Sequence, residues 1–308
     1  LKIGSIKLKN RLFLAPMVDV TDLAFRMLCR EQGAAIAYTE MLYLGAILHE
    51  NEKTKKLMKT AQEDKPIGLQ VTGNNIEEFK KFSKLKVLEN YNLIDINCGC
   101  PSNKIVGSEA GSYLLKTPDK IGEMIKILKD AGFMVTAKIR LGFKNNNVVE
   151  VSKKIEKAGA DLLTIHARTA EQRSSEPADW KWISRVKREI GIPIVGNGGI
   201  INGKTASEML EIADGAMIAG AVIGNPFVFR EILSYLKTGK EKEVTAKERI
   251  RAFKDYLGLA KKYEIADINR IKYLGSNFLK GFDGASSARA ELMKLKNFEE
   301  VNRFIGNL

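Results

Sequence analysis

Short apolar runs alternate with longer segments of helical pattern along the first 235 residues. Such continuous runs are typical of strands buried on both faces of a parallel sheet, and the helical segments between them fit right-handed crossovers. The pattern predicts eight strands, at residues 11–17, 35–41, 67–73, 93–99, 134–140, 162–168, 192–198 and 215–221. Eight alternations favour a (β/α)8 TIM barrel over an open doubly wound sheet, which usually has fewer strands.

Several helix starts are marked between these runs. Thr117 is a candidate N-cap with Pro118 at the first helical position, and Asn74 or Asn75 precedes a turn that contains acidic residues. We therefore expect residues 1–235 to form the barrel domain.

The pattern changes after residue 235. No further strand is predicted, and Thr245 and Glu248 form a capping box at the start of a long helical segment. Residues 236–308 are expected to form a small helical-bundle domain. This segment holds 16 Lys and Arg against 10 Asp and Glu, which makes it denser in positive charge than the barrel.

Polar residues close most of the predicted strands. Such residues are Glu40, Gln70, Asn97, Lys138, Arg140, His166 and Arg168. Each alone could cap a loop or reach solvent at a strand end. Barrels of this class carry their chemistry on the loops after the C-terminal strand ends, so the repetition predicts a functional site there.

Two glycine-rich segments, 196–199 and 219–224, follow the last two predicted strands. Exposed amides at a helix N-terminus bind phosphate, and barrels commonly place a phosphate site between strands seven and eight. A phosphorylated cofactor is therefore expected. The segments do not match G-x-G-x-x-G, which argues against a Rossmann site.

Composition and charge limit the partners, the cellular location and the metal sites that the protein can have. The net charge of +13 suits a polyanionic partner such as nucleic acid, and it equally fits a lysine-rich solvated surface. The apolar runs are too short to span a membrane and the first residues lack a signal-peptide core, so a cytoplasmic protein is expected. Two histidines and one C-x-C pair do not complete a zinc site, and three cysteines argue against a disulfide framework. No metal is expected.

The motifs together are similar to those of one family. They are "APMVDVTDLAFR" (15–26), "TEM" (39–41), "NCGCPSNKIV" (97–106), "KIRLG" (138–142), "HART" (166–169), "ADW" (178–180), "GNGGI" (196–200), "GNPFVF" (224–229) and "KYLGSNFLKGFDGASSAR" (272–289). The sequence resembles the tRNA-dihydrouridine synthases, flavin enzymes that reduce a uridine of tRNA to 5,6-dihydrouridine. The resemblance covers nearly the whole chain.

The resemblance implies a bound FMN, NADPH as the reductant and tRNA as the substrate. We expect a monomer, although the sequence does not fix the oligomeric state. The FMN-binding residues that it implies are Pro16, Met17, Gln70, Lys138, His166, Asn197, Gly198, Ala219 and Gly220. Cys100 matches the catalytic acid, and Asn97, Arg140 and Arg168 match substrate-binding positions.

General chemistry is consistent with these roles. Hydride transfer to carbon 6 of uracil leaves a need for a proton at carbon 5, and an ordinary thiol with a pKa of about 8.5 still carries one at neutral pH. The base must be extruded into the barrel mouth while a basic domain binds the phosphates. Cys98, at the end of a buried strand, is interpreted as a packing residue.

Three departures from the family pattern stand out. Gly220 occupies a position where the family often has arginine, Ser174 and Glu176 replace an aromatic residue and a glycine, and Tyr273 replaces a common histidine. Two other functions also fit the pattern: a flavin barrel oxidoreductase acting on a small pyrimidine, similar to dihydroorotate dehydrogenase, and an RNA-binding protein built on an inactive barrel. Flavin absorbance in the purified protein separates the last of these from the enzymes.

Overall fold

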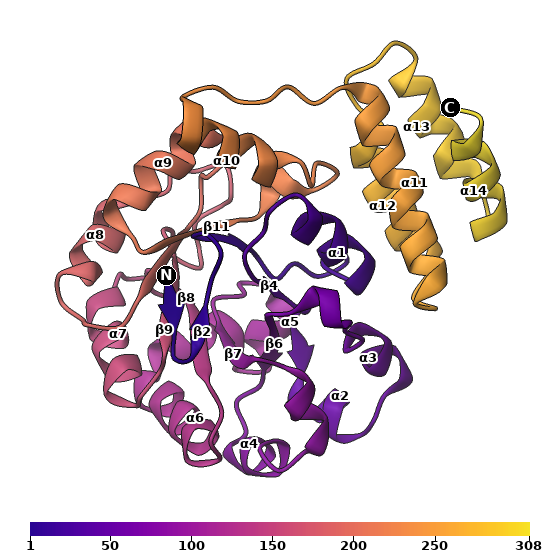
Figure 1. The fold of residues 1–308 in the computed structure, drawn as a ribbon. Coiled ribbons are helices and arrows are strands. Elements are labelled where there is room, and N and C mark those ends of the chain that lie inside the picture. The colour runs from indigo at the N-terminus through magenta and orange to yellow at the C-terminus, as the bar shows by residue number, and fades with distance from the viewer.

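A barrel of parallel strands surrounded by helices makes up most of the computed structural model, which describes residues 1–308 (Figure 1). Every segment predicted to be a strand contains one, so the (β/α)8 prediction is confirmed. The barrel strands are β3 (Leu12–Leu14), β4 (Ala37–Tyr38), β6 (Ile67–Thr72), β7 (Leu93–Cys98), β8 (Val135–Arg140), β9 (Leu162–His166), β10 (Ile194–Asn197) and β11 (Gly215–Ile218).

The sheet runs in the order β3-β11-β10-β9-β8-β7-β6-β4, with parallel neighbours throughout. A single parallel bridge between Phe13 and Ile36 closes the ring between β3 and β4. The predicted strand at 35–41 is shorter than expected, because the chain leaves the sheet after Tyr38 and returns as β5 (Leu42–Tyr43), which also pairs with β6.

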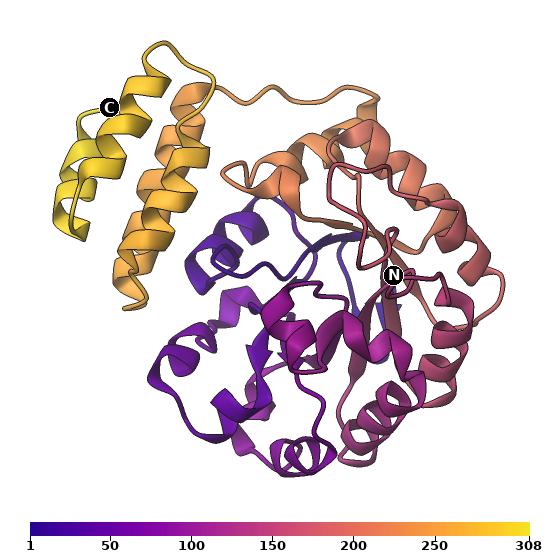
Figure 2. The same cartoon turned by 180° about the vertical axis from the view of Figure 1, so that it is seen from behind.

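Helices cover the outside of the barrel (Figure 2). They are α1 (Leu23–Glu31), α2 (Leu44–Leu48), α3 (Glu52–Leu57), α4 (Ile76–Phe82), α5 (Asn103–Gly107), α6 (Pro118–Asp130), α7 (Val148–Lys157), α8 (Lys181–Lys187), α9 (Gly203–Ile212) and α10 (Val228–Thr238). Short 3-10 turns occur at η1 (Gln62–Asp64), η2 (Lys86–Asn90), η3 (Gly111–Lys116) and η4 (Gly220–Val222).

The helix boundaries follow the sequence closely. Asn75 caps α4 by accepting from the Glu77 and Glu78 N–H groups, and Thr245 and Glu248 form the expected capping box. Thr117 precedes Pro118 at the start of α6 as predicted, but its side chain makes no capping bond.

The barrel interior is apolar at one end and polar at the other. Inward-facing side chains of the strands form a buried cluster that includes Phe13, Leu93, Leu162 and Val195. The N-terminal hairpin of β1 (Lys2–Ile3) and β2 (Ile6–Lys7), which the sequence pattern did not predict, lies across this end and adds the fully buried Ile3 (Figure 1). The polar side chains are therefore left at the opposite, C-terminal end.

Four further helices form a bundle beside the barrel. Helix α10 runs to Thr238, slightly beyond the expected boundary at 235, and the segment 239–245 then crosses to the bundle (Figure 1). Its helices are α11 (Ala246–Lys262), α12 (Ile268–Phe278), α13 (Ala285–Lys294) and α14 (Phe298–Gly306). No strand occurs after β11.

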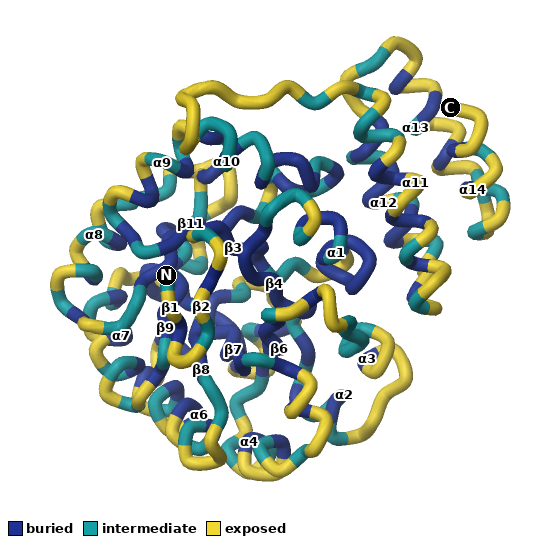
Figure 3. Tube along the Cα trace, viewed as in Figure 1, coloured by how far each residue is buried: buried dark blue, intermediate teal, exposed yellow.

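The bundle packs against the barrel through α11 and α12. The Phe25 ring on α1 meets the Phe278 ring edge-on, with centroids 6.2 Å apart, and Phe278 stacks on Phe253 of α11. Lys59 Nζ donates to the Tyr263 carbonyl at 2.7 Å. Buried residues thus continue from the barrel into the inner face of the bundle, whereas the 239–245 segment is mostly exposed (Figure 3). None of the helices combines the length and the apolar character that a membrane span needs.

Candidate active site

Seven of the residues expected at the site line one cavity at the C-terminal ends of the strands. The cavity has a volume of about 200 Å³, and these residues are Pro16, Gln70, Asn97, Cys100, Lys138, Arg140 and His166. Strand register explains the clustering, because Asn97 lies opposite Lys138 and Arg140 lies opposite His166. Sequence-distant polar groups therefore meet at one level of the barrel.

Four other expected residues do not line the cavity but adjoin residues that do: Met17, Arg168, Asn197 and Gly198. Met17 packs against the apolar interior, and Asn197 lies in register with His166 on the neighbouring strand. Arg168 Nη1 lies 3.0 Å from His166 Nε2. A side chain at Gly198, where φ is +101°, would place its Cβ 2.7 Å from the His166 ring, so only glycine lets the backbone approach this closely.

The glycine-rich segments differ from the expected arrangement in one respect. Ala219 and Gly220 open only the three-residue turn η4, and the next helix, α10, begins at Val228. The N–H groups of Gly198, Gly199 and Gly220 nevertheless donate to no protein acceptor. They are therefore free to bind an anion through backbone donors.

A chain of amide side chains fixes the loop after β7. Asn97 Oδ1 accepts from the Gly99 and Cys100 N–H groups at 3.1 and 2.9 Å. Asn97 Nδ2 donates to Gln70 Oε1 at 2.9 Å, and Gln70 Nε2 donates to Asp95 Oδ2 at 2.7 Å. Asp95 was not among the expected residues, although its place two positions before Asn97 puts it on the same face of the strand.

The three cysteines are unpaired and occupy different environments. Cys29 and Cys98 are fully buried, and burial raises the pKa of both thiols. Cys98 is therefore a packing residue, as expected. Cys100 is partly exposed and lines the cavity. It is the cysteine that a bound substrate can reach.

Positive charge dominates the other side of the cavity. Burial, and then the neighbouring Lys138, Arg140 and Arg168, lower the pKa of His166 to about 2, so its imidazole is neutral. Because a guanidinium only donates, the contact from Arg168 makes His166 Nε2 the acceptor and places the ring proton on Nδ1. Burial and the Arg140 charge lower the pKa of Lys138 to about 8.

The two arginines expected to bind substrate also hold loops together. Arg140 donates to the carbonyls of Gly99 and Thr169, each at 2.8 Å, and so links the loops after β7 and β9. Arg168 Nε donates to the Glu176 carbonyl at 2.7 Å. Glu176, one of the positions that differ from the family pattern, therefore lies in a loop whose backbone is hydrogen-bonded to the Arg168 side chain.

Glu40, at the end of the second barrel strand, pairs with the helical domain. Arg270 of α12 reaches Glu40 at 2.7 Å and Asp22 at 3.1 Å, and Tyr256 of α11 donates to Asp22 at 2.9 Å. Arg270 and both carboxylates are nearly inaccessible to solvent. This contact could not be predicted from the sequence pattern, because it joins residues that lie far apart in the chain.

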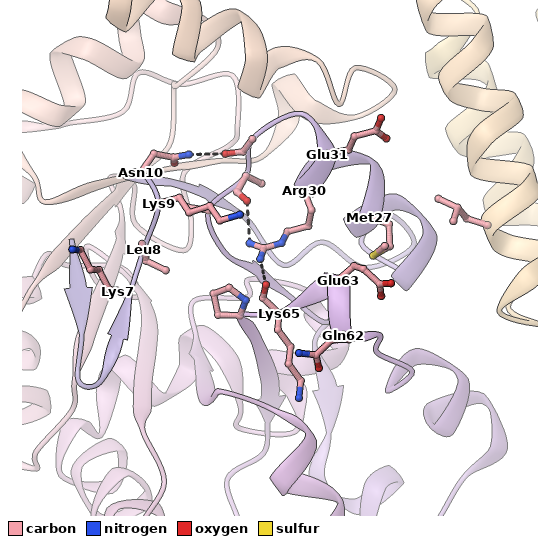
Figure 4. A pocket seen from close by; sticks show the side chains of 15 residues that line it. Lys7, Leu8, Lys9, Asn10, Met27, Arg30, Glu31, Gln62, Glu63 and Lys65 are labelled. Atoms are coloured by element: carbon pink, nitrogen blue, oxygen red, sulfur yellow. Dashed lines mark hydrogen bonds between the residues drawn. The ribbon is translucent and has the colours of Figure 1, made fainter.

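A larger cavity, of about 670 Å³, lies away from these groups at the N-terminal end of the barrel (Figure 4). Two of its polar side chains bind backbone carbonyls around the C-terminal end of α1. Asn10 donates to the Gly33 carbonyl, and Arg30 donates to the carbonyls of Ala34 and Lys65. None of the expected site residues lines it. The smaller cavity at the strand ends is therefore the candidate active site.

Comparisons with known proteins identify the family of the chain. The family described as Dihydrouridine synthase (Dus) matches residues 13–306. A probable tRNA-dihydrouridine synthase of Aquifex aeolicus is 34% identical over 302 residues, which cover 95% of this chain and 94% of the relative. The tRNA-dihydrouridine synthase B of Escherichia coli K12 is 32% identical over 318 residues, covering 97% and 99%.

Solved structures support the fold alone, since their sequences are distant. Morphinone reductase has a TM-score of 0.55 at 9% identity and covers 80% of this chain and 91% of its own. An old yellow enzyme homologue from Zymomonas mobilis has a TM-score of 0.52 at 10% identity, covering 81% and 94%. With the family match over nearly its whole length, the chain belongs to the dihydrouridine synthase family.

Proposed function

We propose that this chain reduces a uridine of cytoplasmic tRNA to 5,6-dihydrouridine, with FMN as its cofactor and NADPH as the reductant. Membership of the dihydrouridine synthase family supports the reaction, and the names of its relatives support tRNA as the substrate. The observation that carries the proposal is Cys100, the partly exposed thiol on a loop that Asn97 fixes at the barrel mouth.

The residues around the cavity fit a flavin mononucleotide. The bare backbone at Gly198 and the unpaired N–H groups of Gly198 and Gly220 suit a phosphate, with Asn197 and Ala219 beside them. Lys138 and neutral His166 face the cavity with Gln70, and Pro16 and Met17 border it. FMN held there by these residues and reduced by NADPH would supply a hydride for carbon 6 of the uracil.

Cys100 supplies the proton that completes the reduction. Its S–H bond breaks as a C–H bond forms at carbon 5, on the face opposite the hydride, and the thiolate then regains a proton from water. Asn97 keeps one amide hydrogen beyond its bond to Gln70, and this hydrogen is available to a uracil carbonyl. Lys138 stabilises negative charge that develops beside it.

The helical domain, residues 236–308, binds the tRNA. Its surplus of Lys and Arg suits phosphates, and its position beside the barrel mouth allows an extruded base to enter the cavity. Arg140 and Arg168 contact the nucleotide at the rim. The enzyme acts as a monomer.

Expression in a bacterial strain that lacks all dihydrouridine synthases tests the function. Mapping of dihydrouridine in the recovered tRNA is expected to show one or a few restored positions, and a yellow protein with flavin absorbance is expected on purification. A colourless protein that takes up no added FMN and restores no position would contradict the proposal.

Cys100→Ala tests the acid. Loss of a general acid lowers kcat by about 100-fold or more, while the FMN content stays that of the wild type. Cys98→Ala is the matched control, because this neighbouring thiol faces the outer packing of the barrel. Wild-type turnover by Cys100→Ala would remove Cys100 from the mechanism.

A further inference from the structure

Asp95 lies in a polar layer just beneath the candidate active site. Gln70, Asp95 and Thr136 are in register on three neighbouring strands, so their side chains meet inside the barrel. Asp95 Oδ2 accepts from Gln70 Nε2 at 2.7 Å, and its Oδ1 accepts from Thr136 Oγ1 at 2.5 Å. The side chain is almost fully buried.

The Asp95 carboxylate determines the orientation of the Gln70 and Asn97 side-chain amides. An ionised carboxylate only accepts hydrogen bonds, so Gln70 must direct its NH2 group towards Asp95 and its oxygen towards Asn97. Asn97 must then direct its NH2 group towards Gln70. This leaves Asn97 Oδ1 to accept from the Gly99 and Cys100 N–H groups.

Each amide has an alternative orientation with its oxygen and nitrogen exchanged. If Gln70 turned over, Asn97 would present its NH2 group to the Gly99 and Cys100 N–H groups. Donor would then face donor, and the Cys100 loop would lose its attachment. The orientation of the loop therefore depends on a group that lies three hydrogen bonds away from it.

We propose that Asp95 is a positioning residue, whose carboxylate fixes the Gln70 and Asn97 amides and thereby holds the Cys100 thiol in place for proton transfer. This inference rests on the proposed function only in its last step. The orientation of the Cys100 loop is a property of the protein without substrate.

The electrostatics of the layer support a functional role. Burial raises the pKa of Asp95 to about 6, while Gln70, Thr136 and the Lys138 charge oppose that rise, so the group is ionised at neutral pH. Tyr38 is a further ionisable group close enough to interact with Asp95. Both hydrogen bonds of the buried Asp95 carboxylate come from neutral groups, Gln70 and Thr136, and a buried carboxylate that is not paired with a cation destabilises the fold. An asparagine would fill the same volume without that charge.

The test compares Asp95→Asn with Thr164→Val in the complete, FMN-loaded enzyme. Thr164 also faces the barrel interior, in register with Lys138, but its buried hydroxyl has no hydrogen-bond partner. Asp95→Asn is expected to lower kcat by about 10- to 100-fold with little change in KM for tRNA. Its thermal stability is expected to equal or exceed that of the wild type, whereas Thr164→Val is expected to match the wild type in kcat.

A second measurement needs neither tRNA nor turnover. The rate at which iodoacetamide alkylates Cys100, followed by mass spectrometry, reports on the loop, because Cys29 and Cys98 are buried. Asp95→Asn is expected to raise this rate severalfold, and Thr164→Val to leave it unchanged. In an Asn97→Ala background the effect of Asp95→Asn is expected to vanish, since the connection to the loop is already broken.

Three results would overturn the inference: wild-type kcat and alkylation rate in Asp95→Asn, an undiminished effect of Asp95→Asn in the Asn97→Ala background, or an equal effect from Thr164→Val. If the wild-type protein made no dihydrouridine, the proposed function would fail. The alkylation rates would still decide whether Asp95 positions Cys100.

Discussion

At the barrel mouth the charged side chain of Lys138 weakens the fold, whereas His166 is neutral. The pKa of Lys138 is lowered to about 8 and that of His166 to about 2, in each case chiefly by burial. A base with a lowered pKa in the folded state releases protons on folding, so its protonated form opposes folding. The Lys138 charge therefore does not contribute to stability, and the proposed function gives it a role in binding and catalysis.

Replacement of Lys138 by Met should therefore stabilise the flavin-free protein. The ordinary lysine pKa is 10.5 and the folded value is about 8, so the gain should be about 3 kcal/mol near neutral pH. It should shrink as the pH rises from about 8 to 10.5, where the unfolded chain also loses its proton. Urea unfolding across this range measures it, with the exposed Lys126→Met on α6 as the control. A stability loss at neutral pH would contradict the buried-charge explanation.

Most polar residues of the site could be predicted from the sequence because they close strands of strong apolar pattern. Asn97, Lys138 and His166 end such runs, and a barrel brings the ends together. Asp95 is not among the predicted residues, because it lies inside its strand and not at the strand end. A charged residue inside an apolar run, two positions before Asn97, nevertheless indicates an inward position. Which amide oxygen faces which partner follows only from three-dimensional geometry.

At the level of elements, the loop after η4 sets how closely α12 approaches the barrel. Gly224 has φ of +70°, and a Cβ there would lie 2.3 Å from the Asn277 backbone carbon. Glycine is required at this contact for both its conformation and its lack of a side chain.

Gly224→Ala is expected to destabilise the protein by about 2 to 4 kcal/mol, since it combines backbone strain with overpacking. Two glycines separate these causes. Gly239 has φ of +73° with no neighbour within 4 Å, so Gly239→Ala should cost about 1 kcal/mol. Gly220 has neither constraint, so Gly220→Ala should change stability by less than about 0.5 kcal/mol. Thermal unfolding measures all three, and a Gly224→Ala loss no larger than that of Gly239→Ala would exclude the clash with α12.

The elements themselves were predictable to different degrees. Long apolar runs gave β6, β7 and β8 almost to the residue, whereas β4 is only two residues long because its neighbours Thr39–Met41 turn out of the sheet. The N-terminal hairpin was missed, since strands of two residues leave almost no periodicity. Ile3 of this hairpin packs on the apolar cluster at the N-terminal end of the barrel, and this contact exists only in the folded chain.

At the level of the whole molecule, one buried arginine joins the two parts of the chain. Arg270 lies between Glu40 and Asp22, and Glu40 Oε2 also accepts from the Asp19 N–H at 2.8 Å. Glu40 directly precedes Met41, which lines the candidate active site. The orientation of the helical domain is thereby linked to the barrel mouth.

Arg270→Met should destabilise the protein by about 3 to 5 kcal/mol, because it leaves two buried carboxylates without their cation. Burial raises the pKa of Glu40 to about 7 even though Arg270 opposes that rise, so removal of Arg270 should raise it further. An acid with a raised folded-state pKa loses stability as the pH rises, and the loss in Arg270→Met should therefore be greater near pH 8 than near pH 5.5. Urea unfolding at the two pH values measures this difference.

The same change should loosen the helical domain. Proteolytic cleavage in the exposed 239–245 segment should be faster in Arg270→Met, and kcat/KM for tRNA should fall, because the bundle no longer holds the substrate at a fixed angle to the barrel mouth. A second change, Glu40→Gln, should restore part of the lost stability by removing one unpaired charge. Arg303→Met, an exposed charge loss on α14, is the matched control. Equal stability losses at both pH values, with no rescue by Glu40→Gln, would show that Arg270 contributes through packing and not through charge.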